Sequence, residues 1–116
     1  MIPILLVTIG YLYLYSVSGT NYVSAADARK MIKSGKINAI VDVRTNFEYD
    51  RGHYPGAIHL PVTSMNEKTT KNLPKTEILV YCNTGQRARV AAEKLVSLGF
   101  KNIYYISGLY NTLMPR

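Results

Sequence analysis

Residues 78–98, ILVYCNTGQRARVAAEKLVSL, decide how this chain folds. The run begins with residues 78–81, a short apolar stretch that predicts a buried strand. From Arg87 to Leu98 apolar residues recur at the spacing of one helical face, and Gly99 is a typical stop for such a helix. A short loop that begins at Cys82 joins the two elements. The segment therefore predicts a strand, a tight loop and a helix in immediate succession.

Elements of the same two kinds are predicted on both sides of this unit. Ser24 has the position of an N-cap, and the helix that it begins should end near Gly35. Residues 37–43 are apolar and rich in β-branched side chains, as in a buried strand. Short strands are predicted over 57–60 and 102–106, and a short helix over 47–51. Because strands alternate with helices, the sequence predicts an α/β domain with a mostly parallel sheet.

The composition limits the class of protein. With 116 residues, of which 47% are hydrophobic, the chain has room for one domain with one ordinary core. It has one cysteine, so no intrachain disulfide can form. A single free thiol is typical of a protein in a reducing compartment, or of a cysteine with a chemical function. The formal net charge of +7 would attract an anionic substrate, an acidic partner or a lipid surface, or would be a solvated surface. The basic residues are scattered along the chain, and the sequence contains no known nucleic-acid-binding motif, so we expect no nucleic-acid partner.

The first 19 residues differ from the rest of the chain. No charged side chain lies between Ile2 and Val17, and the small-residue stretch 16–21 is typical of a linker. We therefore divide the chain into a hydrophobic N-terminal segment, 1–19, and a domain, 20–116. As a helix of about 17 residues the segment would measure about 25 Å, slightly less than a hydrocarbon core of about 30 Å. Tyrosines near its C-terminal end suit a membrane interface, which favours a transmembrane anchor.

Two other interpretations of this segment stay open. Ser16 and Ser18 suit a signal-peptide cleavage site, although no positive charge precedes the apolar run; cleavage would give a secreted or periplasmic protein. The segment could also pack on the domain as a hydrophobic element. If it is an anchor, the Lys and Arg residues that follow it predict a single-pass membrane protein with the domain in the cytoplasm.

The loop at Cys82 can support covalent chemistry. Open α/β sheets bind ligands at the carboxyl ends of their strands, and the next helix points N–H groups and the positive end of its dipole at the loop. This field favours a thiolate, and Arg87 adds a fixed positive charge. Gly85 lets the backbone bend so that several N–H groups face inward. We therefore predict Cys82 and Arg87 as catalytic residues, and not Cys82 as an ordinary buried side chain.

Four stretches resemble the rhodanese family of sulfurtransferases in order and spacing. Residues 41–61 are similar to the upstream signature of the family, with VDVR at 41–44, Glu48-Tyr49, and GHYPGAIHLP at 52–61. Residues 80–88 resemble its active-site loop, and residues 98–100 and 106–108 resemble short motifs that follow this loop in the family. The resemblance covers about residues 21–110 and implies a rhodanese-like α/β fold. That fold has about five mostly parallel strands with helices on both faces.

The resemblance also implies an activity. In this family the cysteine takes a sulfane sulfur from a donor, becomes a persulfide and passes the sulfur to a thiophilic acceptor. The implied partner is a small anionic sulfur donor such as thiosulfate, or a persulfide-carrying protein. No metal and no organic cofactor are expected. The substrate-binding residues of the loop are then Asn83, Thr84, Gly85 and Gln86.

Two positions of the loop depart from the family pattern. Many members carry Arg where this chain has Asn83, and a Ser is frequent where it has Ala88. One positive charge and one hydroxyl donor are therefore missing near the sulfur. This predicts weaker use of thiosulfate and would suit a neutral or protein-borne donor.

Two other functions compete with sulfur transfer. A membrane-tethered binding module could keep the fold with little catalysis, although the intact Cys82 and Arg87 argue against it. Phosphatases and arsenate reductases of the same fold are the second alternative, and the phosphatase loop runs Cys-x5-Arg. Here four residues separate Cys82 from Arg87, so the loop is one residue shorter. The smaller space that it encloses suits a single sulfur atom better than a phosphate.

Polar residues upstream of the loop have a different expected role. Asp42 and Arg44 end the predicted strand 37–43, and we expect them to support the loop by pairing with neighbouring charges or backbone groups. Persulfide transfer needs little proton chemistry, so we do not expect Asp42 or His53 to act as a general acid or base. Nothing in the spacing brings His53 or His59 to Cys82 or indicates a metal site.

Overall fold

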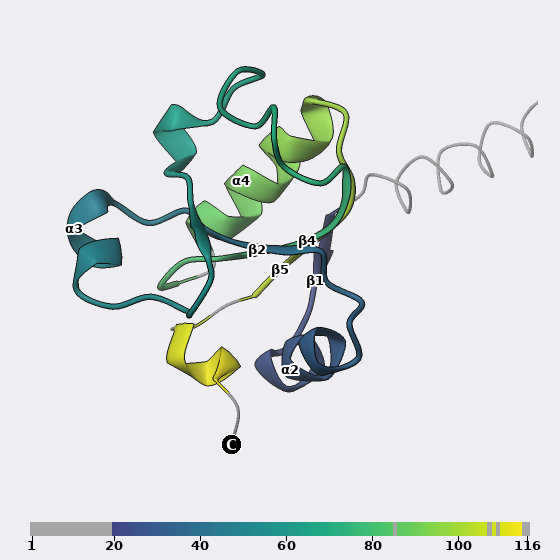
Figure 1. Cartoon of the computed structure of the whole chain (residues 1–116), viewed down its shortest axis with the longest axis vertical. Helices are drawn as coiled ribbons and strands as arrows, with labels where there is room; N and C mark the ends of the chain where they lie inside the picture. The colour runs from purple at the N-terminus through teal and green to yellow at the C-terminus, as the bar shows by residue number, and fades with distance from the viewer. Residues whose placement is uncertain (1–19, 85, 107, 109, 115–116) are drawn as a thin grey trace, which may run out of the picture.

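A computed structural model of the chain describes residues 20–84, 86–106, 108 and 110–114 (Figure 1). Five parallel strands form one sheet in the order β1-β5-β4-β2-β3. The strands are β1 (Thr20–Tyr22), β2 (Ala39–Asp42), β3 (Ile58–His59), β4 (Thr76–Tyr81) and β5 (Lys101–Tyr105). The helices are α2 (Ala25–Lys33), α3 (Asn46–Asp50) and α4 (Gln86–Ser97), with 3-10 turns η1 (Val62–Ser64) and η2 (Tyr110–Leu113). The predicted α/β fold with helices on both faces of a parallel sheet is confirmed.

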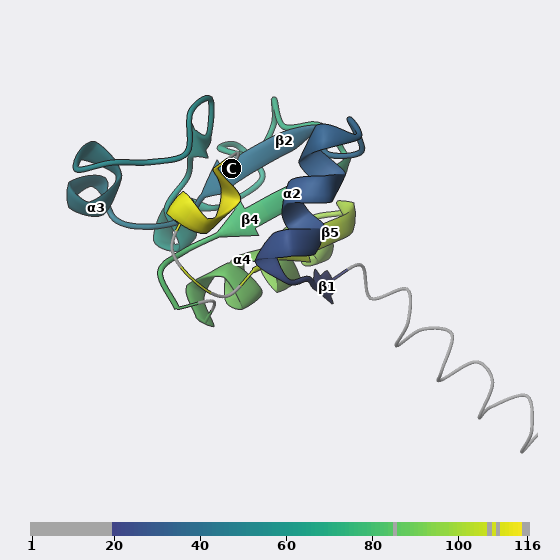
Figure 2. The same cartoon turned by 90° about the horizontal axis from the view of Figure 1, so that it is seen from below.

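The helices form a layer on each face of the sheet. Helix α4 covers one face, and α2 with the short turn η2 covers the other (Figures 1 and 2). Helix α3 lies beyond the edge of the sheet in both views. The sheet therefore has two separate cores, one under each layer.

The alternation of side chains along β4 assigns residues to these cores. Ile78, Val80 and Cys82 pack in the cluster that contains the buried alanines of α4. Leu79 and Tyr81 pack in the cluster on the α2 and η2 side. Successive side chains of a strand point to opposite faces, so Tyr81 and Cys82 are neighbours in sequence that serve different layers.

The predicted helix starts are confirmed where a polar cap precedes the helix. The Ser24 hydroxyl accepts a hydrogen bond from the Asp27 N–H at 3.1 Å, as an N-cap does. At α3, Thr45 and Glu48 form a complete capping box, in which each side chain bonds the backbone N–H of the other. These caps define where α2 and α3 begin, within one residue of the sequence-based expectation.

One sequence-based interpretation is wrong at the start of the domain. The sequence predicts a linker over 16–21, but Thr20 and Asn21 belong to β1, which pairs in parallel with β5. A three-residue edge strand carries no hydrophobic alternation, because its conformation depends on the ladder that β5 offers. Residues 16–19 lie outside the described part of the chain.

The predictions for the N-terminal segment, 1–19, also concern residues outside the described part. Within 20–84, 86–106, 108 and 110–114, no helix has the length and apolar character needed to cross a membrane. The transmembrane anchor, its orientation and the signal-peptide alternative therefore stay predictions.

Candidate functional site: a buried cysteine at the start of a helix

Cys82 follows the last residue of β4 and is fully buried. Its side chain points to the α4 side of the sheet, where the Ala88 backbone N–H donates a hydrogen bond to Sγ at 3.3 Å. Ala88 belongs to the first turn of α4, whose N–H groups have no carbonyl partner within the helix. The sulfur thus occupies the place where a helix best stabilises negative charge.

Arg87 also belongs to the first turn of α4, and its guanidinium points at a carboxylate. Its two terminal nitrogens donate to Glu48, with Nη1–Oε1 at 2.8 Å and Nη2–Oε2 at 3.1 Å. This fork geometry joins the start of α4 to α3. The side chains remain in contact with solvent, with exposed fractions of 38% for Arg87 and 24% for Glu48. The guanidinium is therefore paired and accessible at once.

Glu48 is the residue that the sequence-based site did not include. The capping box holds it, since Oε1 also accepts from the Thr45 N–H at 3.2 Å and from the Thr45 hydroxyl at 3.0 Å. The hydrogen bonds from Arg87 are the largest cause that holds the pKa of Glu48 at about 2, well below its usual value. The same hydrogen bond raises the pKa of Arg87, and a Cys82 thiolate raises it further. Glu48 therefore stays ionised at any physiological pH.

The predicted substrate-binding residues stand around this pair. Asn83 is half-buried and donates a hydrogen bond from Nδ2 to Glu48 Oε2. Its carbonyl oxygen, Oδ1, is buried and has no hydrogen-bond partner within the described residues. Thr84 and Gln86 are exposed at the rim, and Gly85 lies outside the described residues. Asn83 thus offers an acceptor at the position directly after Cys82.

Asp42 and Arg44 form a buried ion pair on the other face of the sheet. Arg44 donates to both oxygens of Asp42 through Nε and Nη2, at 2.8–3.1 Å, and its backbone N–H adds a bond at 2.9 Å. The Tyr81 hydroxyl donates to Asp42 at 2.7 Å and accepts from the Tyr54 N–H at 2.9 Å. Burial works to raise the pKa of Asp42, but the bonds from Arg44 and Tyr81 outweigh it and lower that pKa.

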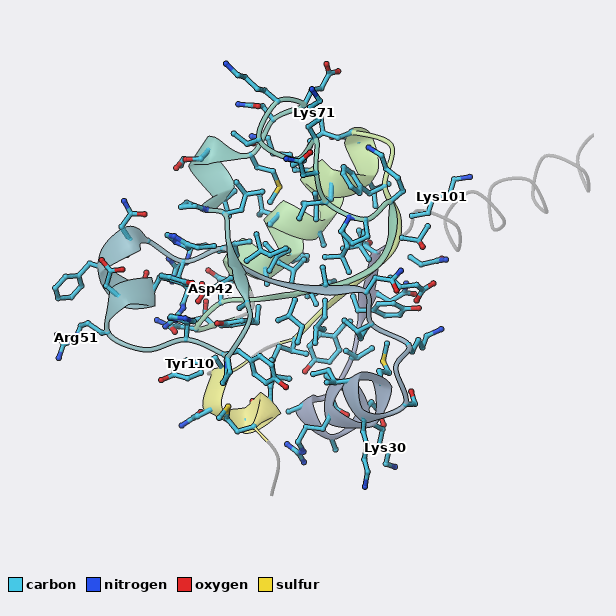
Figure 3. The ribbon with its side chains drawn as sticks, in the orientation of Figure 1. Lys30, Asp42, Arg51, Lys71, Lys101 and Tyr110 are labelled. Carbon is cyan, nitrogen blue, oxygen red and sulfur yellow. The ribbon has the colours of Figure 1, made fainter. Side chains whose placement is uncertain are left out.

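The ion pair also fixes the loop that precedes β3. Arg44 Nη2 donates to the Gly52 carbonyl oxygen at 2.5 Å, and its guanidinium carbon lies 5.0 Å from the centre of the Tyr110 ring. Figure 3 shows Asp42 inside the molecule, above Tyr110 of η2. Arg44 thus pairs with the charge of Asp42 and with a backbone carbonyl, as expected, but on the face of the sheet opposite to Cys82. A supporting role of the pair in the Cys82 site stays a prediction.

Gly52 is expected to be intolerant of any side chain. Its φ of +151° is strained for other residues, and an added Cβ would overlap the Tyr110 hydroxyl oxygen. We expect Gly52→Ala to lower the free energy of unfolding by about 1–3 kcal/mol, as measured by urea titration followed by circular dichroism. Gly35→Ala is the matched control, because Gly35 also has a positive φ, +80°, but no neighbour within 4 Å of the added carbon. Equal losses in the two variants would show that Tyr110 does not restrain this loop.

The histidines are held by backbone and by one tyrosine. His53 Nδ1 lies 3.0 Å from the Tyr49 carbonyl oxygen, and His59 Nε2 lies 2.8 Å from the Arg44 carbonyl oxygen. The Tyr49 ring stacks on both imidazoles, with centroids 3.8 Å and 4.2 Å away. Within the described residues, no group of three or more His, Cys, Asp or Glu side chains could hold a metal ion.

The arrangement defines a class of protein: an α/β domain with a buried cysteine on the loop between a central parallel strand and the helix that follows it. A family profile described as "Rhodanese-like domain" matches residues 24–112. The chain belongs to the rhodanese-like domain family, as its motifs predicted.

Known relatives agree with this assignment. The chain is 32% identical over 90 residues to the thiosulfate sulfurtransferase GlpE of Coxiella burnetii, which covers 78% of this chain and 83% of GlpE. It is 34% identical over 93 residues to the tRNA uridine(34) hydroxylase of Buchnera aphidicola, which covers 75% of this chain. This chain spans only about 30% of the length of that hydroxylase.

Solved structures show the same fold. The crystal structure of BH2092 from Bacillus halodurans superposes with a TM-score of 0.67 at 33% identity, over 88% of this chain and 74% of that one. The solution structure of the rhodanese-like domain of Alr3790 from Anabaena superposes with a TM-score of 0.68 at 24% identity, over 79% and 71%. The arrangement of strands and helices is thus that of known rhodanese-like domains.

Proposed function

We propose that this chain is a sulfurtransferase that carries a sulfane sulfur on Cys82. The observation that carries the proposal is the position of Cys82 Sγ, which accepts the Ala88 N–H at the start of α4. An anionic sulfur gains there from the helix dipole and from a donor fixed by the fold. The likeness to GlpE, which is named a thiosulfate sulfurtransferase, supports the same reaction.

The proposed reaction has two displacement steps. First, the Cys82 thiolate attacks the outer sulfur of a donor; the donor's bond to that sulfur breaks, and the leaving group departs with the electron pair. The product is a persulfide on Cys82. In the second step a thiophilic acceptor attacks the outer sulfur of the persulfide, which restores the thiolate. In both steps the charge on sulfur stays beside the first turn of α4.

Burial of Cys82 has a consequence for the proposed reaction. The side chain is fully buried, so neighbouring atoms must move before a donor reaches the sulfur. Exclusion of water strengthens the electrostatic stabilisation of the thiolate and protects the persulfide from other nucleophiles. In this proposal the exposed Thr84 and Gln86 contact the donor.

The mass of the protein after exposure to a donor tests the proposal. We expect the purified chain to gain one sulfur atom with thiosulfate, with a hydropersulfide or with a persulfidated protein, and to lose it when cyanide is added. Cys82→Ser and Cys82→Ala should gain none while keeping the circular dichroism spectrum of the folded chain. No gain of sulfur with any of the three donors would reject the proposal.

We also propose that residues 1–19 anchor the domain to a membrane, with the domain on the cytoplasmic side. The support is the uncharged run from Ile2 to Val17 and the basic residues that follow it. In sealed vesicles with the cytoplasmic face outward, an added protease should digest the domain. Protection of the domain would contradict the orientation, and recovery of the full chain in the soluble fraction would contradict the anchor.

A further inference from the structure

We propose that Glu48 and Asn83 make the Cys82 site selective for a hydropersulfide carried on a thiol, R–S–S–H, over thiosulfate. The inference rests on the proposed sulfurtransferase function and names its donor class. It follows from two features of the rim: the pairing of Arg87, and the unpaired oxygen of Asn83.

Glu48 removes most of the positive charge that a dianionic donor would need. Both terminal nitrogens of Arg87 are bonded to the carboxylate, at 2.8 Å and 3.1 Å, so the pair has no net charge. The Asn83 amide nitrogen also donates to Glu48 and is occupied in the same way. Thiosulfate carries two negative charges, and it would have to displace or approach an ionised carboxylate to reach Arg87.

Asn83 presents a hydrogen-bond acceptor where an oxyanion would need a donor. Its Oδ1 is buried without a partner among the described residues, and a buried acceptor gains from any donor that enters. The assignment of this oxygen follows from the opposite end of the amide, which must be nitrogen to donate to Glu48. A hydropersulfide brings an S–H group next to Cys82, whereas the oxygens of thiosulfate are acceptors only.

The two donors can be compared as balanced reactions. With R–S–S–H, the Cys82 thiolate bonds to the outer sulfur, the S–S bond of the donor breaks, and the thiolate R–S⁻ leaves with the electron pair. The proton stays on the transferred sulfur, so the product is Cys82–S–S–H and one negative charge departs. With thiosulfate the same attack releases sulfite, and three negative charges are present at the site throughout. The second reaction depends far more on a free cation than the first.

Glu48→Gln is the variant that tests this selectivity. Gln at this helix position keeps the capping box with Thr45, so the variant should retain α3. The test measures the rate of sulfur loading with thiosulfate and with the hydropersulfide of N-acetylcysteine methyl ester, whose carrier thiol has no charged group. We expect wild type to load faster from the hydropersulfide, and Glu48→Gln to shift the rate ratio about tenfold toward thiosulfate.

Glu93→Gln is the matched control for the change in net charge. Glu93 pairs with Arg89 on the exposed side of α4, at 3.7 Å, and both side chains are more than half exposed. The Glu93→Gln variant should leave the ratio of the two loading rates, hydropersulfide over thiosulfate, unchanged. Asn83→Ala, which removes the acceptor, should slow loading from the hydropersulfide about three- to tenfold and not slow loading from thiosulfate.

Two further donors identify the source of the hydropersulfide. The hydropersulfide of N-acetylcysteine adds one carboxylate to the carrier, and a small protein persulfidated on one surface cysteine represents a protein-borne donor. Loading from either, faster than from thiosulfate, supports the inference and tells which carrier the rim accepts. Equal rates from thiosulfate and the neutral hydropersulfide, with a ratio that Glu48→Gln does not change, would overturn it. Failure of the proposed function is distinct, because then no donor adds sulfur to Cys82.

Discussion

Asp42→Asn is expected to lower the free energy of unfolding by about 3–5 kcal/mol, the range for removing one partner of a buried ion pair. The substitution leaves the Arg44 guanidinium buried without a counterion and turns an NH2 group toward its N–H donors. The Tyr81 hydroxyl loses an ionised acceptor in the same step. Urea titration followed by circular dichroism measures the loss.

Asp27→Asn is a suitable control, since Asp27 lies in the first turn of α2 and is exposed. It should cost less than about 1 kcal/mol. The pH dependence adds a second readout. Because the folded state lowers the pKa of Asp42, its contribution is complete above the ordinary value of 3.8 and is lost as the pH falls through the folded-state value. The difference between wild type and Asp42→Asn should therefore shrink in acid, and a loss below 1 kcal/mol at neutral pH would contradict the assigned role.

Arg87→Ala is expected to slow sulfur loading of Cys82 by about a hundredfold, comparable with the loss of one preorganised donor for a developing anion. The substitution removes the guanidinium and leaves the Glu48 carboxylate, which is bonded to the residue that follows Cys82, without a counterion. That carboxylate repels both the thiolate and its persulfide. Single-turnover loading, quenched and followed by mass, gives the rate.

The double variant Arg87→Ala, Glu48→Gln separates the two causes. If the exposed carboxylate is the main one, the double variant should recover most of the lost rate, and the two changes should be strongly non-additive. Arg89→Ala removes an arginine from the exposed side of α4 and should leave the rate within about twofold. A double variant as slow as Arg87→Ala alone would show that the guanidinium itself acts on the reacting sulfur.

Local pattern was enough to predict most of the fold. Helix α4 carries its apolar face at helical spacing, and Ser24 and Thr45 cap their helices through contacts three residues away. Strand β1 was missed because it is three residues long and depends on pairing with β5, whose residues lie about eighty positions further along the chain. Such a strand has no signal of its own in the sequence.

The candidate site divides in the same way. Cys82 and Arg87 could be found because the strand, loop and helix around them are contiguous. Glu48 lies 39 positions from Arg87, and Asp42 lies 39 positions from Tyr81, so their pairing depends on the order of strands in the sheet. The motif that contains Glu48 was visible in the sequence. Its contact with the loop of Cys82 was not, because no local spacing encodes it.

The last residue of β4 and the residue that follows it face opposite sides of the sheet. Tyr81 faces the buried ion pair, and Cys82 faces the start of α4. Under the proposed selectivity, substitutions of Asn83 and Glu48 would change which sulfur donor reacts and leave the charge pair on the opposite face in place. Donor specificity could then change during evolution with little change in the free energy of unfolding.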